Sequence, residues 1–338
     1  MSRTDRLLAD LERGFTALEE GKLDAAAAIV DRCRRIDRKH PDLIALAAGV
    51  AEASGEHDEA MAQYAALAEA RPDDPVPRIC LARLELHHRD DADAALDHLG
   101  AAFDFIDDEA DLVEAIYVKT EALLARDELE EARATLGELV TSAIDDGDLA
   151  LDLAELALAA EDPKSAARWI DVARTTAPEL EADALHVLGR VHELTGDRPA
   201  MIAAWQEVRR LDLAAPPGDV HVSEDELERT AAAALAELPQ EIRERLERVP
   251  ILIDDVPSED IVNDGFDPRL LGLFQGTPMP EDGALAPSVT NILLFKRNLE
   301  RFAEDEAHLA EEVRITVLHE TAHYFGLDED DLVALGLD

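Results

Sequence analysis

Apolar and small residues recur at the three- and four-residue spacing of amphipathic helices from about residue 5 to residue 213. The helical segments come in pairs that repeat about every 34 residues, and a short polar turn separates the two helices of each pair. A small residue occupies an equivalent place early in each second helix, at Ala26, Ala60, Ala94, Ala132, Ala166 and Ala200. Because antiparallel helices approach closely only where side chains are small, the pattern predicts six stacked hairpins, or twelve helices.

The pattern changes after residues 214–219 (AAPPGD), which are typical of a linker. Residues 223–226 (SEDE) predict a helix start, followed by a helix to about residue 248 that Pro239 interrupts. Short apolar runs at residues 249–253, 270–276 and 289–295 predict three strands, and residues 306–325 predict a final helix. We therefore expect a helical repeat array over residues 1–215 and a small α+β domain over residues 216–338.

The final helix combines two different faces. An apolar stripe is predicted to pack on the sheet and consists of Leu309, Val313, Val317, Leu318, Ala322 and Phe325. A second stripe, with Glu312, Thr316, His319 and His323, is predicted to face a cleft. Histidines four residues apart on a helix lie about 6 Å apart along its axis, so both imidazoles can reach one Zn²⁺. Glu320, inside this HExxH pattern, is placed to act as the general base on water that the metal activates.

A third metal ligand is expected just after the helix. Gly326 allows a sharp helix end, and three carboxylates follow closely. Glu329, six residues beyond His323, is the preferred ligand, while Asp328 and Asp330 are the alternatives.

Three other polar residues of the final helix have weaker functional interpretations. His308 lies too far along the helix to join the same ion and is interpreted as a surface histidine. Thr316 is interpreted either as lining the cleft or as packing. Tyr324 points off the ligand face, which disfavours a role in polarising a carbonyl.

The chain is strongly acidic, with 77 Asp and Glu residues against 32 Lys and Arg residues and a formal net charge of −45. The excess is spread along the chain, since residues 216–338 alone hold 29 acidic and 9 basic residues. A global excess favours a surface adapted to high salt, and the alternative is an acidic groove for basic partners. The lack of basic clusters argues against nucleic acid as a partner.

Cysteine content and hydropathy indicate the compartment. Only Cys33 and Cys80 are present, which gives no disulfide framework and fits a reducing environment. Neither a signal peptide nor an apolar run of transmembrane length is evident. We expect a soluble, cytoplasmic protein that does not bind membranes.

These patterns resemble two families. The 34-residue period and its helix–turn–helix punctuation resemble tetratricopeptide repeats, although most of that family's Trp and Tyr positions differ here. Residues 270–276 (LLGLFQG), 291–297 (NILLFKR) and 311–332 (EEVRITVLHETAHYFGLDEDDL) resemble the short bacterial zincin-like metallopeptidases. That second resemblance covers about residues 235–338 and implies a small mixed sheet with a zinc-bearing helix. The family commonly uses Asp as its third ligand, so Glu329 is a departure.

The sequence thus predicts a zinc metallopeptidase that acts on a peptide or protein substrate. The repeat array would bind that substrate or a protein partner, or would serve as a spacer or dimerisation surface. By analogy with other zincins, the strand around residues 289–295 is expected to present its edge to an extended peptide. The rival hypothesis is a scaffold or chaperone-like binding protein whose zinc site is structural or inert.

Overall fold

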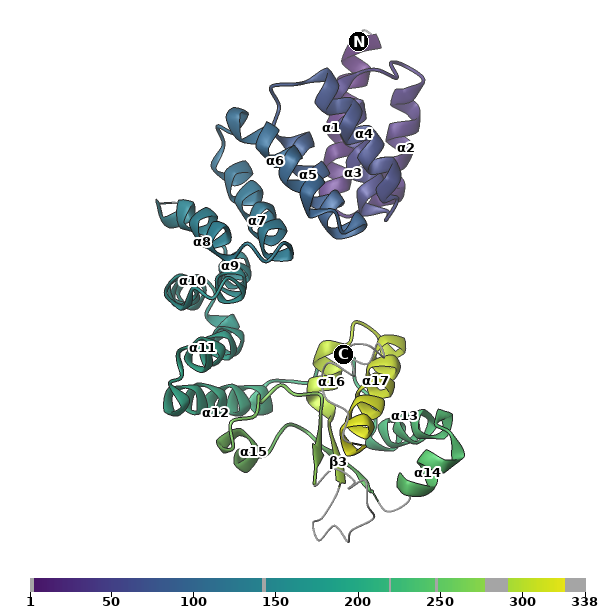
Figure 1. Cartoon of the computed structure of the whole chain (residues 1–338). Helices are drawn as coiled ribbons and strands as arrows, with labels where there is room; N and C mark the ends of the chain where they lie inside the picture. The colour runs from purple at the N-terminus through teal and green to yellow at the C-terminus, as the bar shows by residue number, and fades with distance from the viewer. Residues whose placement is uncertain (1–2, 142–143, 219, 247–248, 277–290, 326–338) are drawn as a thin grey trace. The chain divides into compact units, whose positions relative to one another are not determined.

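The computed structural model describes residues 3–141, 144–218, 220–246, 249–276 and 291–325 (Figure 1). The chain divides into two compact units, Met1–Thr176 and Ala177–Asp338. A helical repeat array is followed by a small α+β domain, which confirms the predicted fold class. None of the helices in these ranges is long and apolar enough to cross a membrane.

Twelve helices form six antiparallel hairpins, as predicted, and the two helices of each hairpin pack on each other. The first unit holds five hairpins: α1 (Arg3–Glu19) with α2 (Leu23–Arg34), α3 (Pro41–Ala53) with α4 (His57–Ala70), α5 (Val76–Arg89) with α6 (Ala92–Ala102), α7 (Glu109–Ala125) with α8 (Leu129–Gly137), and α9 (Gly147–Ala159) with α10 (Pro163–Thr176). The sixth hairpin, α11 (Glu181–Thr195) with α12 (Arg198–Ala214), belongs to the second unit.

The small-residue register is correct in four hairpins and wrong in two. Ala26, Ala60, Ala132 and Ala166 are fully buried, and each is the fourth residue of its helix. In α6 and α12 the helix begins one residue later relative to the predicted register, because Asp91 and Asp197 act as N-caps through their side chains. The buried fourth positions there are Ala95 and Met201, and Ala94 and Ala200 are only half-buried.

The α+β domain follows the predicted order with small shifts in bounds. Its helices are α13 (Glu224–Glu237), α14 (Gln240–Leu246), α15 (Glu259–Asn263), α16 (Lys296–Phe302) and α17 (Glu306–Tyr324). Its strands are β1 (Ile251–Asp254), β2 (Gly272–Gln275) and β3 (Asn291–Phe295). Ser223 and Glu226 form the capping box expected at the start of α13. The two short helices α15 and α16 were not predicted.

The three strands form one mixed sheet in the order β1-β3-β2, with β3 parallel to β1 and antiparallel to β2. The prediction that the strand around residues 289–295 presents an edge is therefore wrong, because β3 is hydrogen-bonded on both sides. Ile292 and Leu294 face a core formed with α13 and α17, while Leu293 and Phe295 pack on Ile261 of α15. Cover on both faces explains why the NILLF run is apolar throughout.

The sixth hairpin packs on the α+β domain inside the second unit. Val262 of α15 contacts Met201 and Trp205 of α12, and Arg209 Nε donates a hydrogen bond of 2.7 Å to the Pro257 carbonyl. The domain boundary predicted between residues 215 and 216 remains a prediction. Helix α12, which precedes this boundary, packs directly on α15 of the α+β domain.

Candidate metal centre

Helix α17 carries the HExxH pattern, is capped at its N-terminus and is buried along one face. The Asp305 side chain accepts a hydrogen bond from the His308 N–H, which caps the first turn. Leu309, Val313 and Val317 are buried in the core that α17 forms with α13 and the sheet, as the predicted apolar stripe requires. The helix is therefore anchored ahead of its last two turns, which carry the candidate site.

The two predicted histidine ligands lie together. The Nε2 atoms of His319 and His323 are 3.0 Å apart, and their ring centroids are separated by 4.7 Å. Two nitrogens bound to one tetrahedral Zn²⁺ at about 2.0–2.1 Å would lie about 3.4 Å apart. The pair thus needs only a small rotation to fit zinc, and imidazole nitrogen is a preferred zinc ligand.

The predicted third ligand, Glu329, and its alternatives Asp328 and Asp330 lie outside the described residues, as does Gly326. Within the described ranges, no group of three His, Cys, Asp or Glu side chains converges as a metal site would. The assignment of the third ligand stays a prediction.

Glu320, the predicted base, is buried between the helix and the edge strand β2. Only 7% of its surface is exposed, and its Oε2 atom accepts a hydrogen bond of 2.6 Å from the Phe274 N–H. The Phe295 N–H donates to the Leu271 carbonyl across the β2–β3 pair, so alternation directs the Phe274 N–H away from β3. The carboxylate is therefore oriented at the outer edge of β2.

This close approach depends on Gly272. A Cβ atom at Gly272 would lie 2.5 Å from Thr316 Cγ2, 3.1 Å from Glu320 Cγ and 3.2 Å from the Leu293 carbonyl oxygen. The sequence signal was available, since an isolated glycine in a strand marks close backbone approach. The contact also decides the role of Thr316, which is buried against β2 and packs rather than lining an open cleft.

His308 and Tyr324, which were given no part in the predicted metal site, make other contacts. His308 Nε2 is 3.3 Å from Glu312 Oε1, and its ring lies 5.9 Å from that of Phe302. Tyr324 packs edge-on against Phe274, with ring centroids 5.8 Å apart, and belongs to the domain core.

A buried ionic network that sequence reasoning missed fixes the segment leading into β2. Asp212 of α12 is 4% exposed and accepts hydrogen bonds from Arg269 Nε at 3.1 Å and from Arg301 Nη1 at 2.6 Å. Burial alone would raise the pKa of the Asp212 carboxyl, but the hydrogen bonds from Arg301 and Arg269 outweigh burial and lower that pKa. The buried Asn298 amide donates to the carbonyls of Pro268 and Leu270 on either side of Arg269.

Comparison with family models identifies the C-terminal region. Residues 246–337 match the model described as zincin-like metallopeptidase. Residues 17–84 match a tetratricopeptide repeat model, so both family resemblances found in the sequence are confirmed.

Solved structures support the repeat fold. The crystal structure of PilW, titled a widely conserved type IV pilus biogenesis factor, is 12% identical, with a TM-score of 0.53 over 60% of this chain and 92% of that one. Pseudomonas aeruginosa pilF is 16% identical, with a TM-score of 0.51 over 62% of this chain and 94% of that one. At such identities the likeness concerns fold alone. No curated protein sequence matches this chain.

Proposed function

We propose that this protein is a zinc-dependent metallopeptidase of the HExxH type, which hydrolyses peptide bonds in a peptide or protein substrate. The observation that carries the proposal is the placement of Glu320, a buried carboxylate beside a close histidine pair and hydrogen-bonded to the outer edge of a strand. The zincin-like family match supports the same chemistry. His319, His323 and Glu329 are proposed to hold Zn²⁺.

The chain's own residues divide the reaction between them. Zinc, when bound, acts as a Lewis acid and makes water acidic enough to be deprotonated near neutral pH. Glu320 accepts that proton and later gives it to the leaving amine. The Phe274 N–H orients one Glu320 oxygen, and the packing of Gly272 against Thr316 sets the distance between helix and strand. In the described ranges β2 pairs only with β3, and apart from the Phe274 N–H, which Glu320 already occupies, its outer edge is the proposed site for an extended substrate.

Replacement of Glu320 by Gln tests the proposal. Wild-type protein, Glu320→Gln and the matched control Glu306→Gln, which changes an exposed carboxylate on the same helix, are compared for zinc content and for cleavage of an unfolded protein in low and molar salt. Wild type and Glu306→Gln should cleave, while Glu320→Gln should keep its zinc and lose at least about a hundredfold in rate.

Cleavage that survives in Glu320→Gln would contradict the proposed base. Full zinc with no cleavage by wild type in either salt would instead favour the scaffold or chaperone-like alternative.

The repeat array indicates a role in protein–protein interaction. We propose that it binds the substrate or a partner protein, and that the protein works in the cytoplasm. Cys33 and Cys80 are both buried free thiols, and burial raises the pKa of the Cys80 thiol to about 12. Inert thiols of this kind suit a reducing compartment.

A further inference from the structure

The first unit contains a groove of about 690 Å³ lined by α5, by α7 and by α9 with the turn before it. Val113 and Tyr117, one helical turn apart on α7, give it an apolar floor together with Leu149 of α9. A groove of this volume with an apolar floor accommodates the side chains of an extended peptide.

The groove walls carry carboxylates that outnumber their cations. Arg83 of α5 is already shared between Glu114 of α7 and Glu52, whose Oε1 lies 2.6 Å from Arg83 Nη2. His87 Nε2 lies 3.2 Å from Glu121 Oε2. Asp152 of α9 is an exposed carboxylate that also lines the groove.

Three polar groups meet at one place on this surface. Burial, followed by the negative charges of Glu121 and Asp152, raises the pKa of the Tyr117 phenol to about 12. Burial also raises the pKa of Asp152, with Asp148 and Asp146 adding to it. Glu121 Oε2 is buried and lies 3.2 Å from His87 Nε2, and burial raises the pKa of the Glu121 carboxyl. Tyr117, Glu121 and Asp152 all line the groove, and Tyr117 and Glu121 are four residues apart on α7 and so share one face of that helix.

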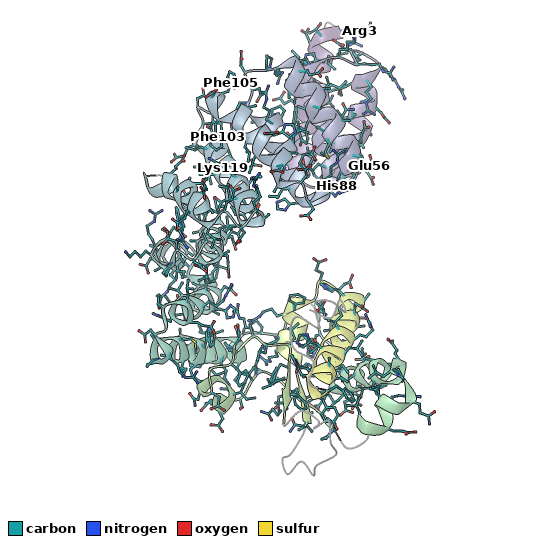
Figure 2. All side chains as sticks on the ribbon, in the orientation of Figure 1. Arg3, Glu56, His88, Phe103, Phe105 and Lys119 are labelled. Atoms are coloured by element: carbon teal, nitrogen blue, oxygen red, sulfur yellow. The ribbon has the colours of Figure 1, made fainter. Side chains whose placement is uncertain are left out.

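Lys119 of α7 does not neutralise the carboxylates of Glu121 and Asp152. Lys119 Nζ lies 5.0 Å from the centroid of the Phe103 ring, a cation–π contact (Figure 2). A divalent metal ion is also a poor occupant, because no group of three metal-ligating side chains converges in the described ranges. The chemistry that fits is a single organic cation with a planar face.

We propose that this groove binds an arginine side chain in an extended segment of a partner protein, with the guanidinium over Tyr117 and between Glu121 and Asp152. A guanidinium stacks on an aromatic ring and donates to two carboxylates at once, which a spherical ion does not do. Apolar neighbours of that arginine would contact Val113 and Leu149. The acidity of the whole chain does not account for Glu121, because this carboxylate is partly buried and such charges are screened by salt much less than exposed ones, whereas Asp152 is exposed.

Binding can be measured without cleavage. The probe is an acetylated and amidated eight-residue peptide with one central arginine among leucines and serines, titrated calorimetrically into full-length Glu320→Gln protein at about 0.5 M salt, where exposed charges are screened. A peptide with citrulline in place of arginine keeps the shape and removes the charge. We expect saturable binding at one site and at least about tenfold weaker binding of the citrulline peptide.

Two sets of variants locate the site. Glu121→Gln with Asp152→Asn should weaken binding of the arginine peptide about tenfold or more. Asp152→Arg, which supplies an internal guanidinium, should abolish binding. The matched control Asp73→Asn with Asp97→Asn removes two exposed carboxylates outside the groove and should change affinity less than about twofold.

Equal weakening by the control pair, equal affinity for the citrulline peptide, or no saturable binding below about 1 mM would overturn the inference. None of these outcomes bears on zinc or on Glu320, so the peptidase proposal is tested separately.

Discussion

Replacing Gly272 by Ala tests how closely α17 packs on the edge strand β2. The added methyl carbon would lie 2.5 Å from Thr316 Cγ2, where carbon atoms normally keep about 3.5–4.0 Å. The other two contacts, with Glu320 Cγ at 3.1 Å and the Leu293 carbonyl at 3.2 Å, are also tight. Helix and strand must therefore separate by about 1 Å, which strains the hydrogen bond from the Phe274 N–H to Glu320.

Overpacking of this kind costs about 1–3 kcal/mol. Thr316→Ser removes the methyl group that makes the closest contact, at a cost of its own near 1 kcal/mol for a buried methyl. Gly272→Ala combined with Thr316→Ser should then be more stable than the sum of the single changes predicts, by about 1 kcal/mol. This coupling isolates the contact from any general effect of alanine in a strand.

Urea unfolding of the four proteins in the cycle gives these free energies, and peptide cleavage by each reports on Glu320. Gly100→Ala is the matched control, because a Cβ there meets nothing within 4 Å and the residue lies inside α6. It should be neutral or stabilise by up to about 1 kcal/mol. If Gly272→Ala is as stable and active as wild type and shows no coupling with Thr316→Ser, the packing described for α17 and β2 is wrong.

Three further predictions concern charge. Asp212→Ala leaves Arg269 and Arg301 without their buried carboxylate and should cost about 3–5 kcal/mol by urea unfolding followed through tryptophan fluorescence; a loss below about 1 kcal/mol would refute the anchoring role. The lowered pKa of Asp212 stabilises the folded protein at pH values above 3.8, the ordinary pKa of this carboxyl. This stabilisation disappears as the pH falls through the lower folded-state pKa, so wild type should lose more stability than Asp212→Asn between pH 5 and pH 3. The melting temperature should rise from low to molar salt, and a flat or falling dependence would contradict salt adaptation.

Periodic features were predictable from the sequence because local patterns encode them. The hairpins, the break at Pro239 and the strand bounds follow from residue spacing and turn chemistry. The register error at Ala94 and Ala200 arose because the N-caps Asp91 and Asp197 set the helix starts, and these caps act through single hydrogen bonds.

Features that depend on tertiary pairing were not predictable in the same way. The apolar NILLF run indicates a buried strand but not its neighbours, so its central place in the sheet was missed. Asp212 lies 57 residues from Arg269 and 89 from Arg301, and charged residues are so frequent here that no spacing singles these out. The close histidine pair was predictable, because four residues on a helix bring two side chains together without any tertiary contact.

We propose that zinc held by α17 makes this protein a peptidase. Removing the zinc and adding it back tests this proposal directly. Wild-type protein is stripped with a chelator, and cleavage of an unfolded protein is followed while Zn²⁺ is added back, with bound zinc counted on the same samples. We expect cleavage to disappear when zinc is removed and to return in proportion to bound zinc, up to about one ion per chain. A protein that takes up no zinc, or cleaves equally well without it, would contradict the account.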